Sequence, residues 1–194
     1  MEKKEMHRDQ RGKDEVAAWR GVLTLEGMRQ FYVDCGREEC KYDGLVDLLS
    51  TINAGQAIVF CNTADHATRL AEQLWASDHL SASAVHGLTD ASEARAALAR
   101  FGQCVTRVLV ITDSVVAAEV PTWAGGALLI NYDLPDHLDD YLARARIGRR
   151  GKYTRQGVVI SLVTEETGGS QVRELEEDYK VVIPPLPADT QHLL

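Results

Sequence analysis

The feature that most constrains the fold is a set of short, almost wholly apolar segments rich in β-branched residues. They span residues 30–35, 57–61, 81–86, 107–112, 127–132 and 158–163. Strands that are covered by helices on both faces lack the polar–apolar alternation of strands that have one face in water. We therefore expect these segments to be parallel strands inside an α/β protein.

The stretches between these segments have helical periodicity. In the first of them, four apolar side chains recur at i, i+3, i+4 and i+7 and should face the core: Leu45, Leu48, Leu49 and Ile52. Further helices are expected over residues 65–77, with Trp75 on the apolar side, and over residues 91–101, 136–146 and 170–180. This alternation with short connections predicts a three-layer, doubly wound parallel sheet.

The chain is long enough for one compact domain. Of its 194 residues, 45% are hydrophobic, so we expect one core and one domain over residues 21–194. Residues 1–20 mix basic and acidic side chains and are expected to form a charged, flexible leader or linker. From about residue 181 a proline-rich ending cannot continue a helix and predicts an extended tail.

Charge and cysteine usage exclude several classes of protein. The net charge of -8 argues against a surface coated by nucleic acid. The four cysteines form no CxxC pair and the histidines lack ligand spacing, so we expect no metal site and a reduced, intracellular protein, cytoplasmic or nuclear. Cys61, in an apolar run, is expected in the core. No apolar run approaches the roughly 20 residues of a membrane span, so we expect no membrane partner. We also expect the protein to be a monomer.

Ligands of doubly wound sheets gather at the carboxyl ends of the strands. In this sequence those ends are Asn62-Thr63, His86-Gly87, Thr112-Asp113 and Asp133-Leu134-Pro135. The sequence contains no GxxxxGK[ST] loop and no DEAD-type acidic tetrad. The chain alone therefore lacks the groups that cradle the β- and γ-phosphates of a nucleotide and hold its magnesium ion, and we predict that it is inactive by itself.

The strand ends carry an ordered series of short motifs. The series reads AIVFCNT at residues 57–63, HG at 86–87, RVLVITD at 107–113, INYDLP at 130–135 and RIGRRGK at 146–152. From residue 21 to the C-terminus it resembles the second, C-terminal RecA-like domain of DEAD-box ATP-dependent RNA helicases of the initiation factor 4A type. The resemblance implies a RecA-like fold. It also implies ATP as a cofactor shared with a first domain absent from this chain, which would hold the magnesium ion.

The last motif implies the catalytic residues. In the family, two of its basic positions act as arginine fingers on a γ-phosphate held by the other domain. The resemblance assigns those positions to Arg149 and Lys152, although an ammonium cannot reproduce the bidentate fork of arginine. Glu119 stands where a family aspartate binds the ATP ribose, so Glu119 and Arg149 are the predicted ATP contacts. Residue chemistry alone favours a solvated basic loop for the run that begins at Arg144.

The other motifs imply contacts to the RNA backbone. By resemblance, the RNA-binding residues are Asn62, Thr63, Gly87, Thr112 and Arg146. Ala91 and Ala94 replace a family Gln-x-x-Arg pair, and Arg95 is shifted by one position, so we expect weak RNA binding. Besides RNA, the resemblance implies two partners: the N-terminal RecA-like domain, in cis or in trans, and a scaffold protein of the MIF4G type.

Two hypotheses about function remain open. In the first, the chain is the C-terminal half of an ATP-dependent RNA helicase that helps to bind the RNA backbone and supplies an arginine finger. In the second, it is a catalytically inactive pseudo-helicase module that acts as a protein-interaction or scaffold element in an RNA–protein or translation complex. A third, an unrelated doubly wound nucleotide binder, is disfavoured because no Gly-rich loop follows a strand.

Overall fold

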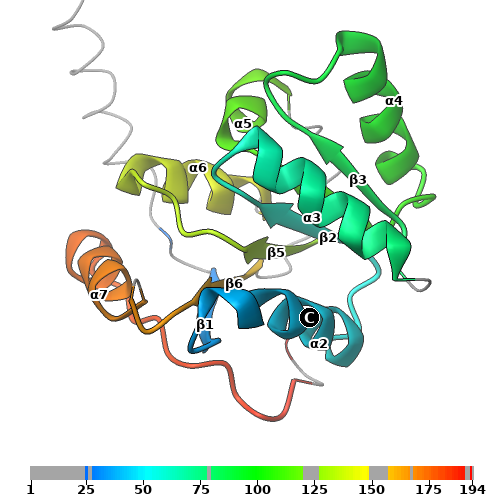
Figure 1. Cartoon of the computed structure of the whole chain (residues 1–194). Coiled ribbons are helices and arrows are strands. Elements are labelled where there is room, and N and C mark those ends of the chain that lie inside the picture. The colour runs from blue at the N-terminus through cyan, green and yellow to red at the C-terminus, as the bar shows by residue number, and fades with distance from the viewer. Residues whose placement is uncertain are drawn as a thin grey trace, which may run out of the picture.

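The computed structural model describes residues 25, 28–77, 80–119, 127–148, 157–166, 168–190 and 193. Six strands form one sheet in the order β1-β6-β5-β2-β4-β3 (Figure 1). They are β1 (Arg29–Asp34), β2 (Ala57–Phe60), β3 (Ala82–Val85), β4 (Val108–Ile111), β5 (Leu128–Asn131) and β6 (Val158–Val163). Every strand pair is parallel.

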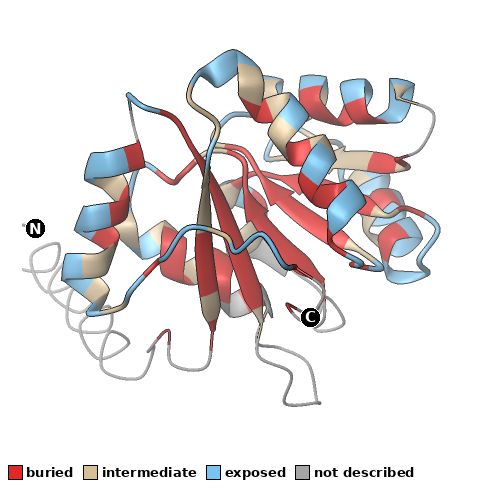
Figure 2. Cartoon of the chain, turned by 90° about the horizontal axis from the view of Figure 1, so that it is seen from below, coloured by how far each residue is buried: buried red, intermediate tan, exposed pale blue. Residues whose placement is uncertain are grey.

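Helices cover both faces of the sheet. They are α2 (Lys41–Thr51), α3 (Ala64–Ala76), α4 (Ala91–Gly102), α5 (Asp113–Glu119), α6 (Leu138–Gly148) and α7 (Gly168–Tyr179), with a short 3-10 turn, η1 (Glu38–Cys40). Figure 2 shows the buried strands between helices whose outer sides are exposed. The expected three-layer, doubly wound parallel sheet is confirmed.

Each face of the sheet has its own apolar core, because side chains alternate along a strand. On one face, Ile58 and Phe60 of β2 pack with side chains of α4, α5, α6 and α7. On the other face, Ala57 and Val59 pack with side chains of α2 and α3. The strands are buried on both sides, which explains why their sequences read as continuous apolar runs.

The prediction for Trp75 was wrong. Its side chain is 65% exposed, whereas the neighbouring Leu74 is fully buried. The buried stripe of α3 consists of Ala67, Leu70, Ala71 and Leu74. Trp75 follows Leu74, the last buried residue of the stripe, and is rotated from it by about 100° around the helix axis. Its indole therefore points away from the core.

The two outer strands of the sheet differ in what covers them. After α7 the chain runs along β1, where the Tyr32 N–H donates to the Pro184 carbonyl (3.1 Å) and the Leu186 N–H donates to the Tyr32 carbonyl (2.8 Å). The other outer strand, β3, pairs only with β4 in the part of the chain that the structure describes.

None of the helices described here has the length and apolarity needed to cross a bilayer.

Candidate nucleotide and RNA interface at the strand ends

Four of the residues predicted to contact RNA lie just beyond the carboxyl ends of three neighbouring strands. Asn62 and Thr63 follow β2, Thr112 follows β4, and Gly87 follows β3 shortly after its last residue. Because β3, β4 and β2 are adjacent and parallel, these residues share one edge of the sheet. Thr63 and Gly87 are exposed, whereas Thr112 is buried.

Gly87 packs closely against the start of α5. A Cβ atom at residue 87 would lie 3.0 Å from Ser114 Oγ and 3.3 Å from Ser114 Cβ, so glycine permits this close approach of the two loops. The Ser114 hydroxyl is also 2.8 Å from Thr112 Oγ1. The Thr112 side chain is therefore engaged inside the protein, whereas Gly87 and Ser114 are both exposed.

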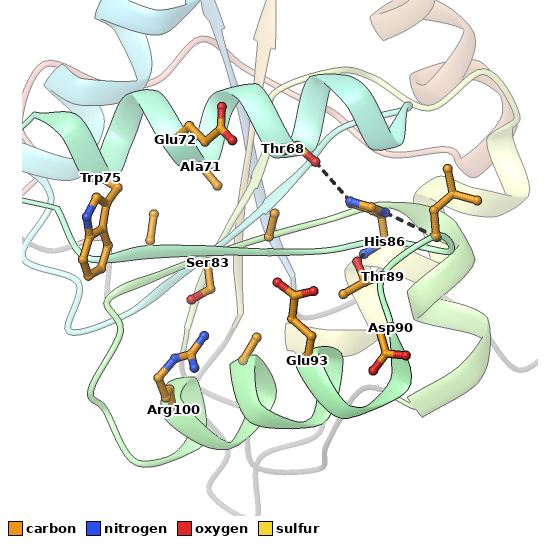
Figure 3. Close-up of a pocket in the computed structure, with 14 residues that line it drawn as sticks. Thr68, Ala71, Glu72, Trp75, Ser83, His86, Thr89, Asp90, Glu93 and Arg100 are labelled. Carbon is orange, nitrogen blue, oxygen red and sulfur yellow. Dashed lines mark hydrogen bonds between the residues drawn. The ribbon is translucent and has the colours of Figure 1, made fainter.

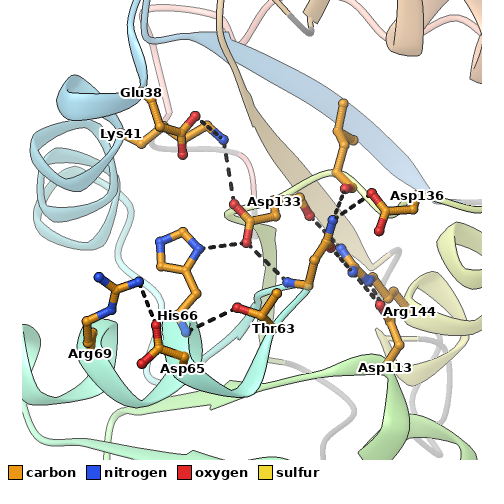
Figure 4. Close-up of polar contacts among 12 residues, drawn as sticks. Glu38, Lys41, Thr63, Asp65, His66, Arg69, Asp113, Asp133, Asp136 and Arg144 are labelled. Atoms are coloured by element: carbon orange, nitrogen blue, oxygen red, sulfur yellow. Dashed lines mark hydrogen bonds and ion pairs between the residues drawn. The ribbon is translucent and has the colours of Figure 1, made fainter.

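Arg144 of α6 is the centre of a buried polar network (Figure 4). Its side chain is 1% exposed, and its five N–H groups make five hydrogen bonds, the full donor capacity of a guanidinium group. The bonds run from Nε to Asp113 Oδ1 (2.6 Å), from Nη2 to Asp113 Oδ2 (2.6 Å) and Asn62 Oδ1 (2.8 Å), and from Nη1 to Asn131 Oδ1 (3.2 Å) and the Asp133 carbonyl (2.6 Å). The group also lies over the Phe60 ring, 5.1 Å from its centroid.

This network ties α6 to the ends of β2, β4 and β5. The contact with Asp113 is a bidentate fork, the strongest arrangement of an arginine with a carboxylate. The interpretation of this run as a solvated basic loop was therefore wrong for Arg144. Helical spacing could have indicated the burial of Arg144, although not its partners, because Arg144 is three residues after Tyr141 and beside Ala145, both of which are buried.

The side chain of Asn62 is engaged within the protein. Its Oδ1 accepts from Arg144, and its Nδ2 donates to the Leu134 carbonyl (2.9 Å) and to Asp136 Oδ1 (3.2 Å). Its backbone N–H donates to Asp133 Oδ2 (3.1 Å). Asn62 thus shapes the edge of the sheet, and its predicted contact with RNA stays a prediction that would need these bonds to rearrange.

A second cluster surrounds Asp133, just after β5. Asp133 Oδ2 is 3.0 Å from His66 Nδ1, and Oδ1 is 3.6 Å from Lys41 Nζ. The hydrogen bond to Asp133 is the main cause that raises the pKa of His66. Burial by itself would raise the pKa of Asp133, but the bonds from His66 and from the Asn62 N–H lower it below its usual value. The Asp133 carboxylate and the His66 imidazolium therefore stabilise each other in their charged forms.

Cys61 lies beside this pair. The potential ligand atoms of Cys61, His66 and Asp133 are within 4.8 Å of one another, an arrangement that the sequence spacing did not indicate. A metal ion binds a thiolate, but burial raises the pKa of the Cys61 thiol. The Lys41 ammonium group also balances the negative charge of Asp133, which a bound metal ion would otherwise do. The donor set therefore fits an internal ion-pair cluster better than a metal centre, and Cys61 is in the core as expected.

Several predicted site residues fall outside what the structure describes. Arg149 and Lys152 lie in the segment 149–156, which is outside the described residues. Arg146 and Glu119 belong to α6 and α5, but their side chains are also outside the described part. The assignments of the arginine finger, the ribose contact and the Arg146 contact to RNA therefore stay predictions.

The start of α4, which faces the same edge, carries an acidic cap. Asp90 Oδ1 accepts from the Ser92 N–H (2.8 Å), and hydrogen bonds from Ser92 hold the pKa of Asp90 below its usual value. Ala91, the first residue of the helix, is exposed, and so is Arg95. A carboxylate thus occupies the N-terminal end of a helix, a position that would otherwise attract a phosphate group.

The fold and this edge define a helicase C-terminal domain. Residues 40–152 match the family described as the helicase conserved C-terminal domain. The match spans more than half of the chain, and the chain belongs to this family. Its six-stranded parallel sheet is RecA-like, as in the C-terminal domains of DEAD-box RNA helicases.

The relatives make the class more specific. The chain is 37% identical over 172 residues to eukaryotic initiation factor 4A of Caenorhabditis elegans, covering 89% of this chain and 41% of the relative. It resembles the solved C-terminal domain of the DEAD-box protein Dbp5 with a TM-score of 0.73 at 25% identity, over 86% of this chain and 93% of that one. Saccharomyces cerevisiae Dbp5 bound to RNA and ADP BeF3 gives a TM-score of 0.74 at 25% identity, over 86% of this chain and 43% of that one. The chain thus spans less than half the length of the initiation factor relative.

Proposed function

We propose that this chain works as the C-terminal half of an ATP-dependent RNA helicase. The observation that carries the proposal is the gathering of Asn62-Thr63, Gly87 and Thr112 at one edge of a parallel sheet. In this role the edge faces RNA and a first RecA-like domain. The exposed Thr63 and Gly87 contact the RNA backbone, and Arg149 supplies positive charge to the γ-phosphate in the transition state.

The first domain carries most of the nucleotide chemistry in this proposal. The sequence has no GxxxxGK[ST] loop, so the β- and γ-phosphates and the magnesium ion are held by the other domain. This chain contributes a phosphate contact only when the two domains close around ATP and RNA. It follows that residues 1–194 alone bind ATP too weakly to detect at micromolar concentration. Micromolar binding in titration calorimetry would contradict this division of labour.

A specific observation favours a second candidate, an inactive module that binds proteins. The Asp90 carboxylate caps the N-terminus of α4, and the Asn62 and Arg144 side chains use their donors inside the protein. These features reduce the number of groups free to hold phosphates. In this alternative the domain acts as a scaffold element in an RNA–protein complex, and a MIF4G-type protein is the expected partner.

RNA-stimulated ATP turnover by the longest native polypeptide that contains this chain distinguishes the two candidates. For the enzyme, Arg149→Ala should lower turnover by a factor of about 10³ or more, the usual contribution of an arginine finger. Arg155→Ala, in the same basic run, is the matched control and should leave most of the turnover. Equal turnover by the parent and by Arg149→Ala would remove Arg149 from the finger role. Absence of turnover in the parent would favour the inactive module.

A further inference from the structure

The outer strand β3 lies at the floor of an open groove (Figure 3). Helix α3 borders one side of the strand and helix α4 the other, and the groove between them has a volume of about 600 Å³. It runs from Trp75 at one end to His86 at the other. Small side chains from the strand and from both helices line it: Ala71, Ala82, Ser83, Ala84 and Ala97.

Within the described residues, no strand pairs with the outer side of β3. The Val108 N–H of β4 donates to the Ser81 carbonyl (2.9 Å), so the backbone groups of Ser81 point toward β4. Successive residues of a strand point these groups to opposite sides. The N–H and C=O groups of Ala82 and Ala84 therefore point away from the sheet, where a further strand could pair with them.

The molecule already contains one example of such an addition, at its other edge. There the tail lies along β1, and Tyr32 exchanges hydrogen bonds with Pro184 and Leu186 in extended conformation. The two edges thus differ in one respect: an extended segment covers β1, whereas no described segment covers β3.

The walls of the groove are acidic and carry two large exposed apolar side chains, Trp75 and Leu88. Glu72 of α3 and Glu93 of α4 line it from opposite sides, and Asp90 lies near the His86 end. Arg100 is the one lysine or arginine in the lining. In the part of the chain that the structure describes, neither Glu72 nor Glu93 has an ion-pair partner, and both are exposed. Trp75, 65% exposed, adds an apolar surface at the far end.

We propose that this groove receives an extended segment of a partner protein, which adds as a strand beside β3. The charges select a segment with basic side chains, which meet Glu72 and Glu93. The Trp75 ring selects an apolar side chain at one end of the segment. Successive side chains of a strand point to opposite faces, so basic residues at adjacent positions of the segment meet Glu72 on one side and Glu93 on the other.

Two other occupants fit the groove less well. RNA is disfavoured because the three carboxylates would repel its phosphates. A second copy of this chain, paired through β3, would bring Glu72 and Glu93 of one copy against the same acids of the other. The proposal goes beyond the function proposed above, because the groove lies along the outer strand and not among the groups that would meet ATP.

Fluorescence anisotropy with residues 1–194 tests the proposal. The probe is a fluorescein-labelled peptide of about eight residues in which pairs of lysines alternate with pairs of valines, so that each face of the extended peptide carries both residue types. We expect saturable binding of this peptide and no binding of a matched peptide with glutamate in place of lysine. N-methylation of alternate peptide amides, which removes the hydrogen-bond donors of a strand, should weaken binding about tenfold or more. Failure of the lysine peptide to bind, or equal binding after N-methylation, would overturn the proposal.

Charge-matched variants separate the groove from the net charge of the protein. The double variant Glu72→Gln/Glu93→Gln should bind the peptide about threefold to tenfold more weakly, since exposed ion pairs contribute modestly. The double variant Glu174→Gln/Glu177→Gln removes the same charge from exposed positions on α7 and should bind like the parent. All four side chains are exposed, so neither variant should unfold. Equal weakening in both would overturn the proposal.

Two further measurements address the other occupants. A labelled oligouridine that is displaced by the lysine–valine peptide, and whose binding falls in the Glu72→Gln/Glu93→Gln variant, would assign the groove to RNA. Sedimentation equilibrium that shows a dimer dissolved by the peptide would assign it to a second copy of the chain. Either result would overturn the proposal. A monomer whose RNA binding is unaffected by the peptide would support it.

Discussion

Replacement of Arg144 by methionine should remove a large share of the stability of this domain. Methionine fills a similar volume but donates no hydrogen bond, so five acceptor contacts are lost at once. Asp113 retains 27% side-chain exposure and can recover some hydration, whereas Asn131, 1% exposed, cannot. Removal of one partner of a buried ion pair typically costs about 3–5 kcal/mol. We expect a loss in that range, against a total stability of about 5–15 kcal/mol for a native domain.

Urea unfolding followed by circular dichroism measures this loss. With a slope of about 2 kcal/mol per molar urea, the midpoint should fall by about 2 M. Arg69→Met is the matched control, because Arg69 makes an exposed ion pair with Asp65, and its effect should stay within about 0.5 kcal/mol. In the Arg144→Met background, Asp113→Asn should restore part of the stability, since it removes a carboxylate left without its partner. A loss below about 1 kcal/mol for Arg144→Met would refute the conclusion that this network holds α6 to the sheet.

Two other features give testable predictions. The hydrogen bond to Asp133 raises the pKa of His66, so the charged histidine contributes stability that is complete below its unfolded pKa of about 6.5 and is lost as the pH rises through the raised folded pKa. The free energy of unfolding lost in His66→Asn should therefore be larger at pH 5.5 than at pH 9 in urea titrations, and a constant difference would contradict the assignment. Burial raises the pKa of Cys61, whereas Cys104 is exposed; mass spectrometry after N-ethylmaleimide treatment of the folded chain should find Cys104 modified first and Cys61 only after unfolding. Rapid modification of Cys61 would show that β2 opens locally.

The fold could be predicted because the decisive signals are local. The strands predicted at residues 57–61, 107–112 and 127–132 each lie within one or two residues of the observed strands, and 158–163 coincides with β6. A helix predicted over residues 136–146 begins two residues later, at Leu138. The segment before it is used by the Asn62 contacts to Leu134 and Asp136, which no local pattern could indicate.

The network at the strand ends could be predicted only in part. Its location at the carboxyl ends followed from the parallel sheet, and Asn62 and Thr112 were placed there. The role of Arg144 was missed because its partners come from three distant segments, at residues 62, 113 and 131–133. Sequence spacing carries no information about such convergence, so a buried guanidinium group looked like one more member of a basic run. The exposure of Trp75 was missed for a simpler reason: the residue lies one position after the last buried residue of its helix.

The Arg144 bonds also bear on how the following residues can vary. Helix α6 ends at Gly148, and the run that contains Arg149 and Lys152 starts from there. The Arg144 guanidinium group, four residues before Gly148, holds α6 against the ends of the strands. Substitutions after Gly148 therefore need not change the position of this helix. Substitutions in the basic run can therefore accumulate while the part of the fold that precedes it keeps its shape.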